Sequence, residues 1–164
     1  MNPDELQAQL RATQDAFDSV AADYDGPRGN NQSIQDMRAE MWRWLDATFA
    51  PASRLIDLGC GTGLDAVRMA RMGHVVTATD WSSQRVARTR DRALREGLSS
   101  SVRALPIGAH ELQRLEGQGA FDGAYSNLGP LNCVPDLGET ARALAVHTRP
   151  GGYAVFTVDR RAHV

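Results

Sequence analysis

From residue 54 onward, short apolar runs alternate with longer segments in which apolar residues recur three or four positions apart. The short runs are typical of buried strands, and the longer segments are typical of helices with one apolar face. Regular alternation of this kind predicts a parallel sheet with helices on both faces. The expected strands are residues 54–58, 74–79, 101–105, 121–125 and 153–158, and the expected helices are residues 64–72, 82–96, 110–115 and 136–148.

Two further helices are expected before the first strand. The first continues to about residue 24, and residues 25–31 are polar and rich in Gly and Asn, which predicts a loop. Ser33 is expected to cap the second helix. We therefore expect residues 1–50 to form a helical cap on a single α/β domain made of residues 51–164.

Composition limits the class of protein. The chain has 164 residues, of which 42% are hydrophobic and 23% charged, with a net charge of −2. These values fit one globular domain with no global attraction to nucleic acid or to an anionic membrane, so we expect neither as a partner. No apolar run is long enough to cross a bilayer, and the polar, acidic N-terminus does not resemble a signal peptide. Two cysteines, Cys60 and Cys133, are too few for a disulfide framework and favour a cytoplasmic location.

The most informative segment is residues 55–63, Leu-Ile-Asp-Leu-Gly-Cys-Gly-Thr-Gly. An apolar run ends in a turn with glycines at alternate positions, and a helix follows. Such a turn lets a ligand approach the backbone closely at the carboxyl edge of a parallel sheet. The dinucleotide-binding pattern places its last glycine one position later, where this chain has Leu64, so the spacing disfavours an NAD-linked oxidoreductase. A glycine-rich turn that binds no ligand is the alternative.

The pattern D-x-G-x-G-x-G resembles motif I of the class I S-adenosylmethionine-dependent methyltransferases. The resemblance implies a Rossmann-like, doubly wound parallel sheet of strand order 3-2-1-4-5, with S-adenosylmethionine as cofactor. It also implies that Asp57 faces the cationic amino group of the ligand. The turn residues implied as cofactor-binding are Gly59, Cys60, Gly61 and Gly63.

The ends of the second and third expected strands extend the resemblance. Asp80 stands where the family has an acid that binds both ribose hydroxyls, and Trp81 follows it where a side chain lies against the adenine. Asp80 could instead only cap the next helix. Relatives often have an Asp after the third strand where this chain has Ala109, so there the backbone of Ala109 and His110 is expected to contact the base. His110 is alternatively a polar residue at a helix start.

After the fourth expected strand, residues 126–137 resemble motif IV of small-molecule methyltransferases. The resemblance implies that Ser126 and Asn127 offer oxygen atoms near the sulfonium and that Asn132 faces the acceptor; an ordinary surface loop is the alternative. Residues 17–25 resemble the family's A-x-x-Y-D segment, in which the tyrosine, here Tyr24, helps to close the ligand pocket. Tyr24 could equally pack against a helix end.

These features predict methyl transfer to a small-molecule acceptor. The reaction is an in-line displacement in which the protein chiefly aligns the nucleophile and excludes water, so no catalytic triad is required. The four histidines show no ligand spacing, and we assign neither a metal nor a catalytic residue.

The family fold has seven strands, and this chain ends shortly after its fifth, residues 153–158. The apolar edge left there favours pairing with another chain. We therefore expect one of three forms: a fragment, a homo-oligomer joined through the edge of this strand, or a natural short form that has lost activity. The alternative to an enzyme is a non-catalytic module that needs a partner or self-association to complete the fold.

Overall fold

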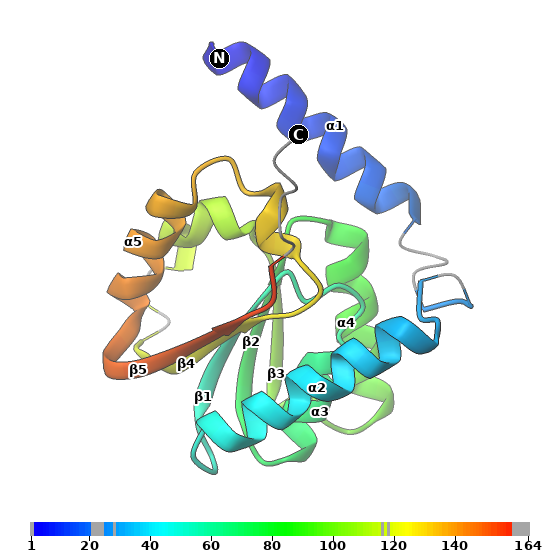
Figure 1. The fold of residues 1–164 in the computed structure, drawn as a ribbon, viewed down its shortest axis with the longest axis vertical. Helices are drawn as coiled ribbons and strands as arrows, with labels where there is room; N and C mark the ends of the chain where they lie inside the picture. The colour runs from blue at the N-terminus through cyan, green and yellow to red at the C-terminus, as the bar shows by residue number, and fades with distance from the viewer. Residues whose placement is uncertain (1, 21–24, 28, 116, 118, 159–164) are drawn as a thin grey trace.

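A computed structural model describes residues 2–20, 25–27, 29–115, 117 and 119–158. Two N-terminal helices precede a five-stranded sheet whose strands alternate with helices (Figure 1). The helices are α1 (Pro3–Val20), α2 (Gln32–Thr48), α3 (Leu64–Arg71), α4 (Ser83–Arg95) and α5 (Leu137–His147), and two 3-10 helices are η1 (Ala109–Leu115) and η2 (Pro130–Cys133). The strands are β1 (Arg54–Leu58), β2 (Val75–Asp80), β3 (Val102–Pro106), β4 (Phe121–Ser126) and β5 (Thr148–Phe156).

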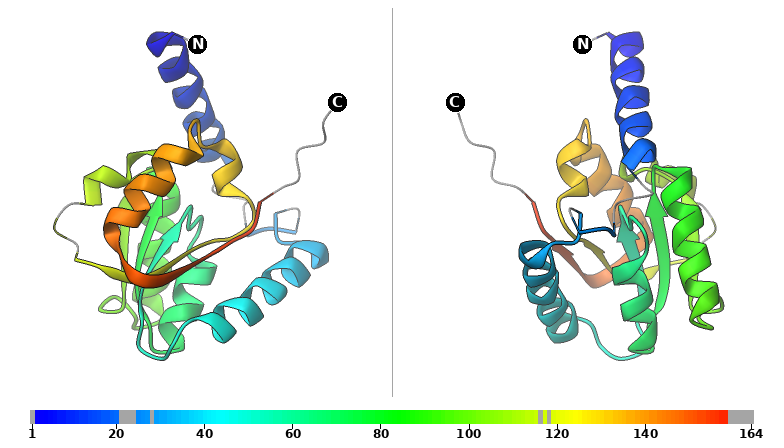
Figure 2. Two further views of the ribbon diagram at one scale, coloured as in Figure 1. Left: turned by 60° about the vertical axis from the view of Figure 1, so that its left-hand side comes forward. Right: turned by 90° about the vertical axis from the view of Figure 1, so that its right-hand side faces the viewer.

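All neighbouring strands are parallel, in the order β3-β2-β1-β4-β5, which confirms the expected doubly wound sheet. Consecutive strand residues point to opposite faces, so Leu55 and Ile56 enter different cores. Leu55 packs with side chains of α2, α3 and α4, whereas Ile56 packs with η1 and α5. Figures 1 and 2 show these two groups of helices on opposite sides of the sheet.

Two local expectations were wrong in detail. The side chain of Asn31, rather than Ser33, caps α2 by accepting a hydrogen bond from the Ile34 N–H (3.1 Å). The fifth strand was expected to begin at residue 153, but β5 begins at Thr148. Residues 149–152 lie inside it, where the register with β4 shifts between the Phe121–Thr148 and Gly123–Tyr153 pairs.

Helix α1 lies above the carboxyl edge of the sheet, where the strands end (Figures 1 and 2). Its Gln14 side chain donates a hydrogen bond to the Trp81 carbonyl (3.0 Å), and its Asp18 accepts one from the Ser82 hydroxyl. Both contacts fall at the junction of β2 and α4, so α1 is joined to the edge that holds the predicted site residues. Within the described ranges, no helix has the length and apolar character needed to cross a bilayer.

Candidate functional site

The glycine turn after β1 has a backbone that other residues adopt only with strain. Gly59 has φ +79° and Gly63, the N-cap of α3, has φ +84°. A Cβ atom on Gly59 would lie 2.3 Å from Pro130 Cβ, and one on Gly63 would lie 2.8 Å from the Thr89 side chain. Conformation and packing therefore both require glycine at these two positions.

Asp80 ends β2 and connects the glycine turn to the start of α4. Its carboxylate accepts hydrogen bonds from the N–H groups of Gly61 and Ser82, both at 2.9 Å, and the residue is 5% exposed. Burial raises the pKa of this carboxyl, while the two backbone donors oppose the shift. The helix cap itself is Ser82, whose hydroxyl accepts from the Arg85 N–H (3.1 Å). Ser82 therefore caps α4, whereas Asp80 bonds to the glycine turn and lines the adjacent cavity.

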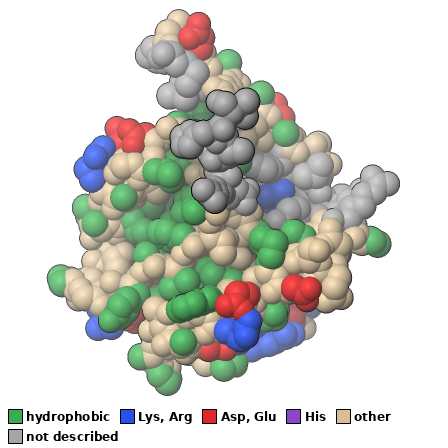
Figure 3. Space-filling model, in the orientation of Figure 1, with side chains coloured by type: hydrophobic (Ala, Val, Ile, Leu, Met, Phe, Trp, Pro, Cys, Tyr) green, Lys and Arg blue, Asp and Glu red, His purple; other side chains and the backbone are tan. Residues whose placement is uncertain are grey.

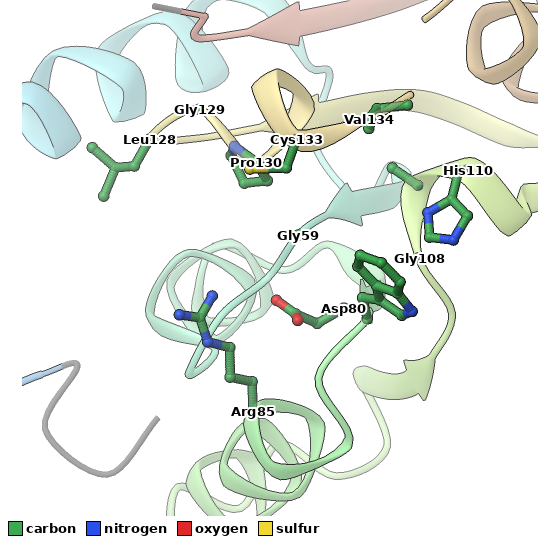
Figure 4. Close-up of a pocket in the computed structure, with 12 residues that line it drawn as sticks. Gly59, Asp80, Arg85, Gly108, His110, Leu128, Gly129, Pro130, Cys133 and Val134 are labelled. Atoms are coloured by element: carbon green, nitrogen blue, oxygen red, sulfur yellow. The ribbon is translucent and has the colours of Figure 1, made fainter. Parts of the chain in front are cut away.

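A cavity of about 280 Å³ opens beside Asp80 at the carboxyl edge of the sheet (Figure 4). This volume is just below the range of about 300–1,000 Å³ that small-molecule sites occupy. Trp81 and His110 form part of its wall and meet edge to face, with ring centroids 4.6 Å apart and planes at 74°. Burial lowers the pKa of His110, so its imidazole is neutral at pH 7. The cavity is therefore bordered by the Asp80 carboxylate, the Arg85 side chain and two uncharged rings.

The predicted cofactor-binding residues divide into those that line this cavity and those that do not. Lining residues are Gly59, Asp80, Trp81, Ala109 and His110. Those that do not line it are Asp57, Cys60, Gly61, Gly63, Ser126 and Asn127. Tyr24 lies outside the described residues.

Several lining residues were not predicted. They are Arg85, Gly108, Leu128, Gly129, Pro130, Cys133 and Val134. Most belong to η2 and the segment leading into it. Both lie in the segment that resembles motif IV, where only Ser126, Asn127 and Asn132 were given roles. The pair Gly129-Pro130 could have indicated the start of η2, because proline favours the first turn of a helix.

Asp57 lies beneath the glycine turn with its side chain almost fully enclosed. It is 2% exposed, and its Oδ2 has no hydrogen-bond partner among the residues that the structure describes. Burial, and next the nearby charge of Asp65, raise the pKa of Asp57 well above its ordinary value of 3.8, while the neighbouring Tyr125 hydroxyl opposes the shift. A buried acceptor without a partner is uncommon and is the kind of atom that a ligand, a water or the neighbouring Tyr125 hydroxyl satisfies.

The remaining predicted side chains are held by internal contacts. The Ser126 hydroxyl donates to the Leu58 carbonyl (2.6 Å), and the Asn127 amide donates to the Asp65 carboxylate (3.2 Å). Cys60 is buried, which raises the pKa of its thiol and makes it a poor nucleophile. Across the described part of the chain, no group of three or more His, Cys, Asp or Glu side chains is arranged to hold a metal ion.

Comparison with known proteins agrees with this geometry. The sequence profile of a family described as "Methyltransferase domain" matches residues 55–152, from β1 into β5. The chain belongs to this family.

Individual relatives cover most of this chain but only part of their own length. A ubiquinone biosynthesis O-methyltransferase from Xanthomonas axonopodis pv. citri (strain 306) is 34% identical over 131 residues, which is 79% of this chain and 52% of the relative. This chain therefore spans about half the length of that protein.

Two solved structures are similar in both fold and sequence. The Burkholderia thailandensis 1,6-didemethyltoxoflavin-N1-methyltransferase, solved with bound 1,6-didemethyltoxoflavin and S-adenosylhomocysteine, has a TM-score of 0.68 and 26% identity, covering 94% of this chain and 64% of that one. The 4+2 cyclase SpnF has a TM-score of 0.63 and 28% identity, covering 71% of this chain and 43% of that one.

Proposed function

We propose that this chain binds S-adenosylmethionine in the cavity beside Asp80 and transfers its methyl group to a small-molecule acceptor. The single observation that carries the proposal is the position of Asp80. Its carboxylate is fixed by N–H groups of the glycine turn and of the α4 start, and it borders a cavity walled by Trp81 and His110. This arrangement matches an adenosine, which presents paired ribose hydroxyls next to a flat base.

The donor set fits each part of the ligand. Asp80 has lone pairs beyond those used by its two backbone donors and would accept from the ribose hydroxyls. Trp81 and the neutral His110 would flank the adenine, together with the backbone of Ala109. We assign the ammonium group to Asp57 Oδ2, the buried acceptor without a partner. Because Asp57 is 2% exposed, that contact requires neighbouring side chains to shift.

S-adenosylmethionine supplies an activated methyl group with its own sulfonium leaving group. The residues of the chain then have to orient the reactants and exclude water. Cys60, Gly61 and Gly63 would shape the turn against which the ligand packs, since their N–H groups are already bonded within the protein. Ser126 and Asn127 would stand near the sulfonium, because β4 lies next to β1 in the sheet. No side chain is assigned as a general base.

A small-molecule acceptor is supported by the relatives. The names of the ubiquinone-pathway and toxoflavin-type methyltransferases describe small-molecule chemistry. The net charge of −2 gives no general attraction to nucleic acid. We further propose a cytoplasmic location, which suits the unpaired Cys60 and Cys133.

We also propose that residues 1–50 act as a helical cap on the domain of residues 51–164. The hydrogen bond from Gln14 to the Trp81 carbonyl and the contact of Asp18 with Ser82 support it, because they join α1 to the wall of the cavity. Tyr24 would contribute to this closure.

Calorimetric titration of S-adenosylhomocysteine into the purified chain tests the cofactor proposal. The protein is first unfolded and refolded to remove any copurified ligand. Micromolar affinity, with no binding of NADH in a parallel titration, is the expected result. A folded protein, by circular dichroism, that binds neither compound would refute the assignment for this chain.

A second candidate is a non-catalytic, self-associating module. The relation to SpnF, whose name describes a cyclase, means that this fold does not by itself specify methyl transfer. In the described sheet β5 is an edge strand, and Tyr153 and Val158 are 63% and 60% exposed. They line a largely apolar groove of about 450 Å³ between α5 and β5, where hydrophobic side chains gather in Figure 3.

We propose that a second copy of the chain pairs along this edge. Analytical ultracentrifugation over a range of concentrations should show a dimer, and Tyr153→Lys should shift it toward monomer. Monomer at all concentrations would contradict the pairing, and mass gained only on adding a different protein would point to another occupant of the groove.

A further inference from the structure

The carboxylate of Asp65 is a buried junction between three separate segments. Asp65 lies in the first turn of α3, directly after the glycine turn, and is 7% exposed. Its Oδ1 accepts from Trp42 Nε1 (2.7 Å), and its Oδ2 accepts from Arg38 Nη1 (2.9 Å) and from Asn127 Nδ2 (3.2 Å). Trp42 and Arg38 belong to α2, and Asn127 follows β4, so one carboxylate joins α2, α3 and the segment after β4.

The bond to Asn127 fixes the start of the segment that lines the cavity. Asn127 precedes Leu128, which has φ +63°, a backbone conformation that costs a leucine roughly 1–2 kcal/mol. Strain of this kind persists only where the surrounding contacts over-determine it. Two contacts do so here: Asp65 holds the Asn127 amide, and the Leu128 N–H donates to Thr157 Oγ1 (2.6 Å).

The same segment reaches the glycine turn from the other side. Two residues after Leu128, the Pro130 side chain packs so closely on Gly59 that a Cβ atom there would overlap it. Asp65 is therefore linked to Gly59 in two ways. It belongs to α3, which directly follows the glycine turn, and through Asn127 it holds the segment whose Pro130 packs on Gly59.

A contribution to folding stability does not by itself explain why Asp65 is buried with three donors. A buried ion pair such as Asp65–Arg38 contributes little more than well-packed apolar residues would, because both charges are removed from water. The α2–α3 contact has a second, more exposed ion pair between Asp46 and Arg68, with oxygen–nitrogen distances of 2.6 and 2.5 Å. Asp65 differs from Asp46 in also holding a residue after β4.

We propose that Asp65 is a positioning residue that, through Asn127, orders the end of the site that receives the sulfonium and the amino-acid part of S-adenosylmethionine. This inference rests on the proposed function. Asp65 does not line the cavity beside Asp80, and its donors are not among the residues that would hold the adenosine. Its effect should therefore be confined to ligands that carry the amino-acid part.

Two ligands test this separation. S-adenosylhomocysteine has both parts, whereas 5′-methylthioadenosine lacks the amino-acid part. Asp65→Asn removes the charge and turns one acceptor into a donor facing other donors. We expect it to weaken S-adenosylhomocysteine roughly tenfold and to leave 5′-methylthioadenosine within about twofold, as expected when a buried donor loses its acceptor.

Asp46→Asn is the matched control, because it removes an α2–α3 ion pair without contact to Asn127. It should lower thermal stability and leave both affinities unchanged. In the Asn127→Ala background, Asp65→Asn should cause no further loss of S-adenosylhomocysteine affinity, since the effect passes through that amide. If Asp65→Asn does not fold, Asp65→Glu replaces it, because it keeps the charge but moves the carboxylate oxygens. Asp65→Glu should likewise weaken S-adenosylhomocysteine and leave 5′-methylthioadenosine nearly unchanged.

Equal weakening of the two ligands, or additive effects of the two substitutions, would overturn the positioning role and leave Asp65 as a structural residue. Failure of the unsubstituted protein to bind either ligand would instead refute the proposed function, so the two failures are distinguishable.

Discussion

The Asp80 carboxylate and the Gly61 N–H are joined by a 2.9 Å hydrogen bond that connects the end of β2 to the glycine turn after β1. Since Asp80 also accepts from Ser82, a single side chain sets the spacing between the turn and the start of α4. The group that we expect to bind the ribose is therefore held rigidly before any ligand arrives, which reduces the ordering cost of binding.

Replacement of Asp80 should weaken the ligand strongly. Asp80→Ala removes the acceptor for the ribose hydroxyls and leaves the Gly61 and Ser82 donors without it, so we expect S-adenosylhomocysteine affinity to fall roughly tenfold or more. Calorimetric titration measures this change. Asp36→Ala, at an exposed acid of α2, is the control and should bind normally; unchanged affinity of Asp80→Ala would exclude Asp80 from the site.

Ligand binding should change the fluorescence of Trp81. This ring lines the cavity, whereas Trp44 is 60% exposed on α2 and bonds to Glu40 (3.0 Å). Titration with S-adenosylhomocysteine should shift the emission of the unsubstituted protein and of Trp44→Phe, and the shift should be absent in Trp81→Phe. A shift that survives in Trp81→Phe would place the ligand elsewhere.

The contact of Gly59 with Pro130 should be visible in stability. Gly59→Ala and Gly73→Ala both introduce a side chain at positive φ, at a cost of about 1–2 kcal/mol. A Cβ atom on Gly73 meets nothing within 4 Å, whereas one on Gly59 would overlap Pro130. Urea unfolding should therefore show a further loss of about 1–3 kcal/mol for Gly59→Ala, as overpacking causes. Equal losses would mean that Pro130 moves away freely.

The buried Asp57 should make stability fall with rising pH. Its pKa in the folded state is raised above the ordinary value of 3.8, so between these two values the folded state binds more protons than the unfolded state. The free energy of unfolding then decreases as pH rises through that interval, and Asp57→Asn should remove the decrease. Relative to the unsubstituted protein, the variant should gain stability as pH rises through that interval, and the difference should level off above it, in urea unfolding.

The pH dependence of stability that Asp46 causes should have the opposite sign to that of Asp57. Its hydrogen bonds with Arg68 lower its pKa below 3.8, so its contribution is present above that value and lost as pH falls. Asp46→Asn should consequently lose stability at neutral pH and match the unsubstituted protein in acid. The same pH trend in both variants would contradict the assignment of Asp57 as a carboxyl with a raised pKa.

The sequence by itself determined the alternation of strands and helices and the glycine turn. β1 has the bounds expected for it, Arg54–Leu58, and α4 differs by one residue at each end. Apolar period, helix caps and glycine stops are local properties, so they can be recognised without knowing what packs where. The resemblance carried by residues 57–63 also led to the strand order that the sheet has.

Only the tertiary structure decided which of the predicted site residues meet at a cavity. The sequence could not reveal that Pro130 packs on Gly59 or that Asp65 holds Asn127, 62 positions away. Nor could it show that residues 149–152 belong to β5, since that depends on pairing with β4. Each of these features depends on side chains that are distant in the chain and adjacent in space, and such contacts leave no periodic signal in the sequence.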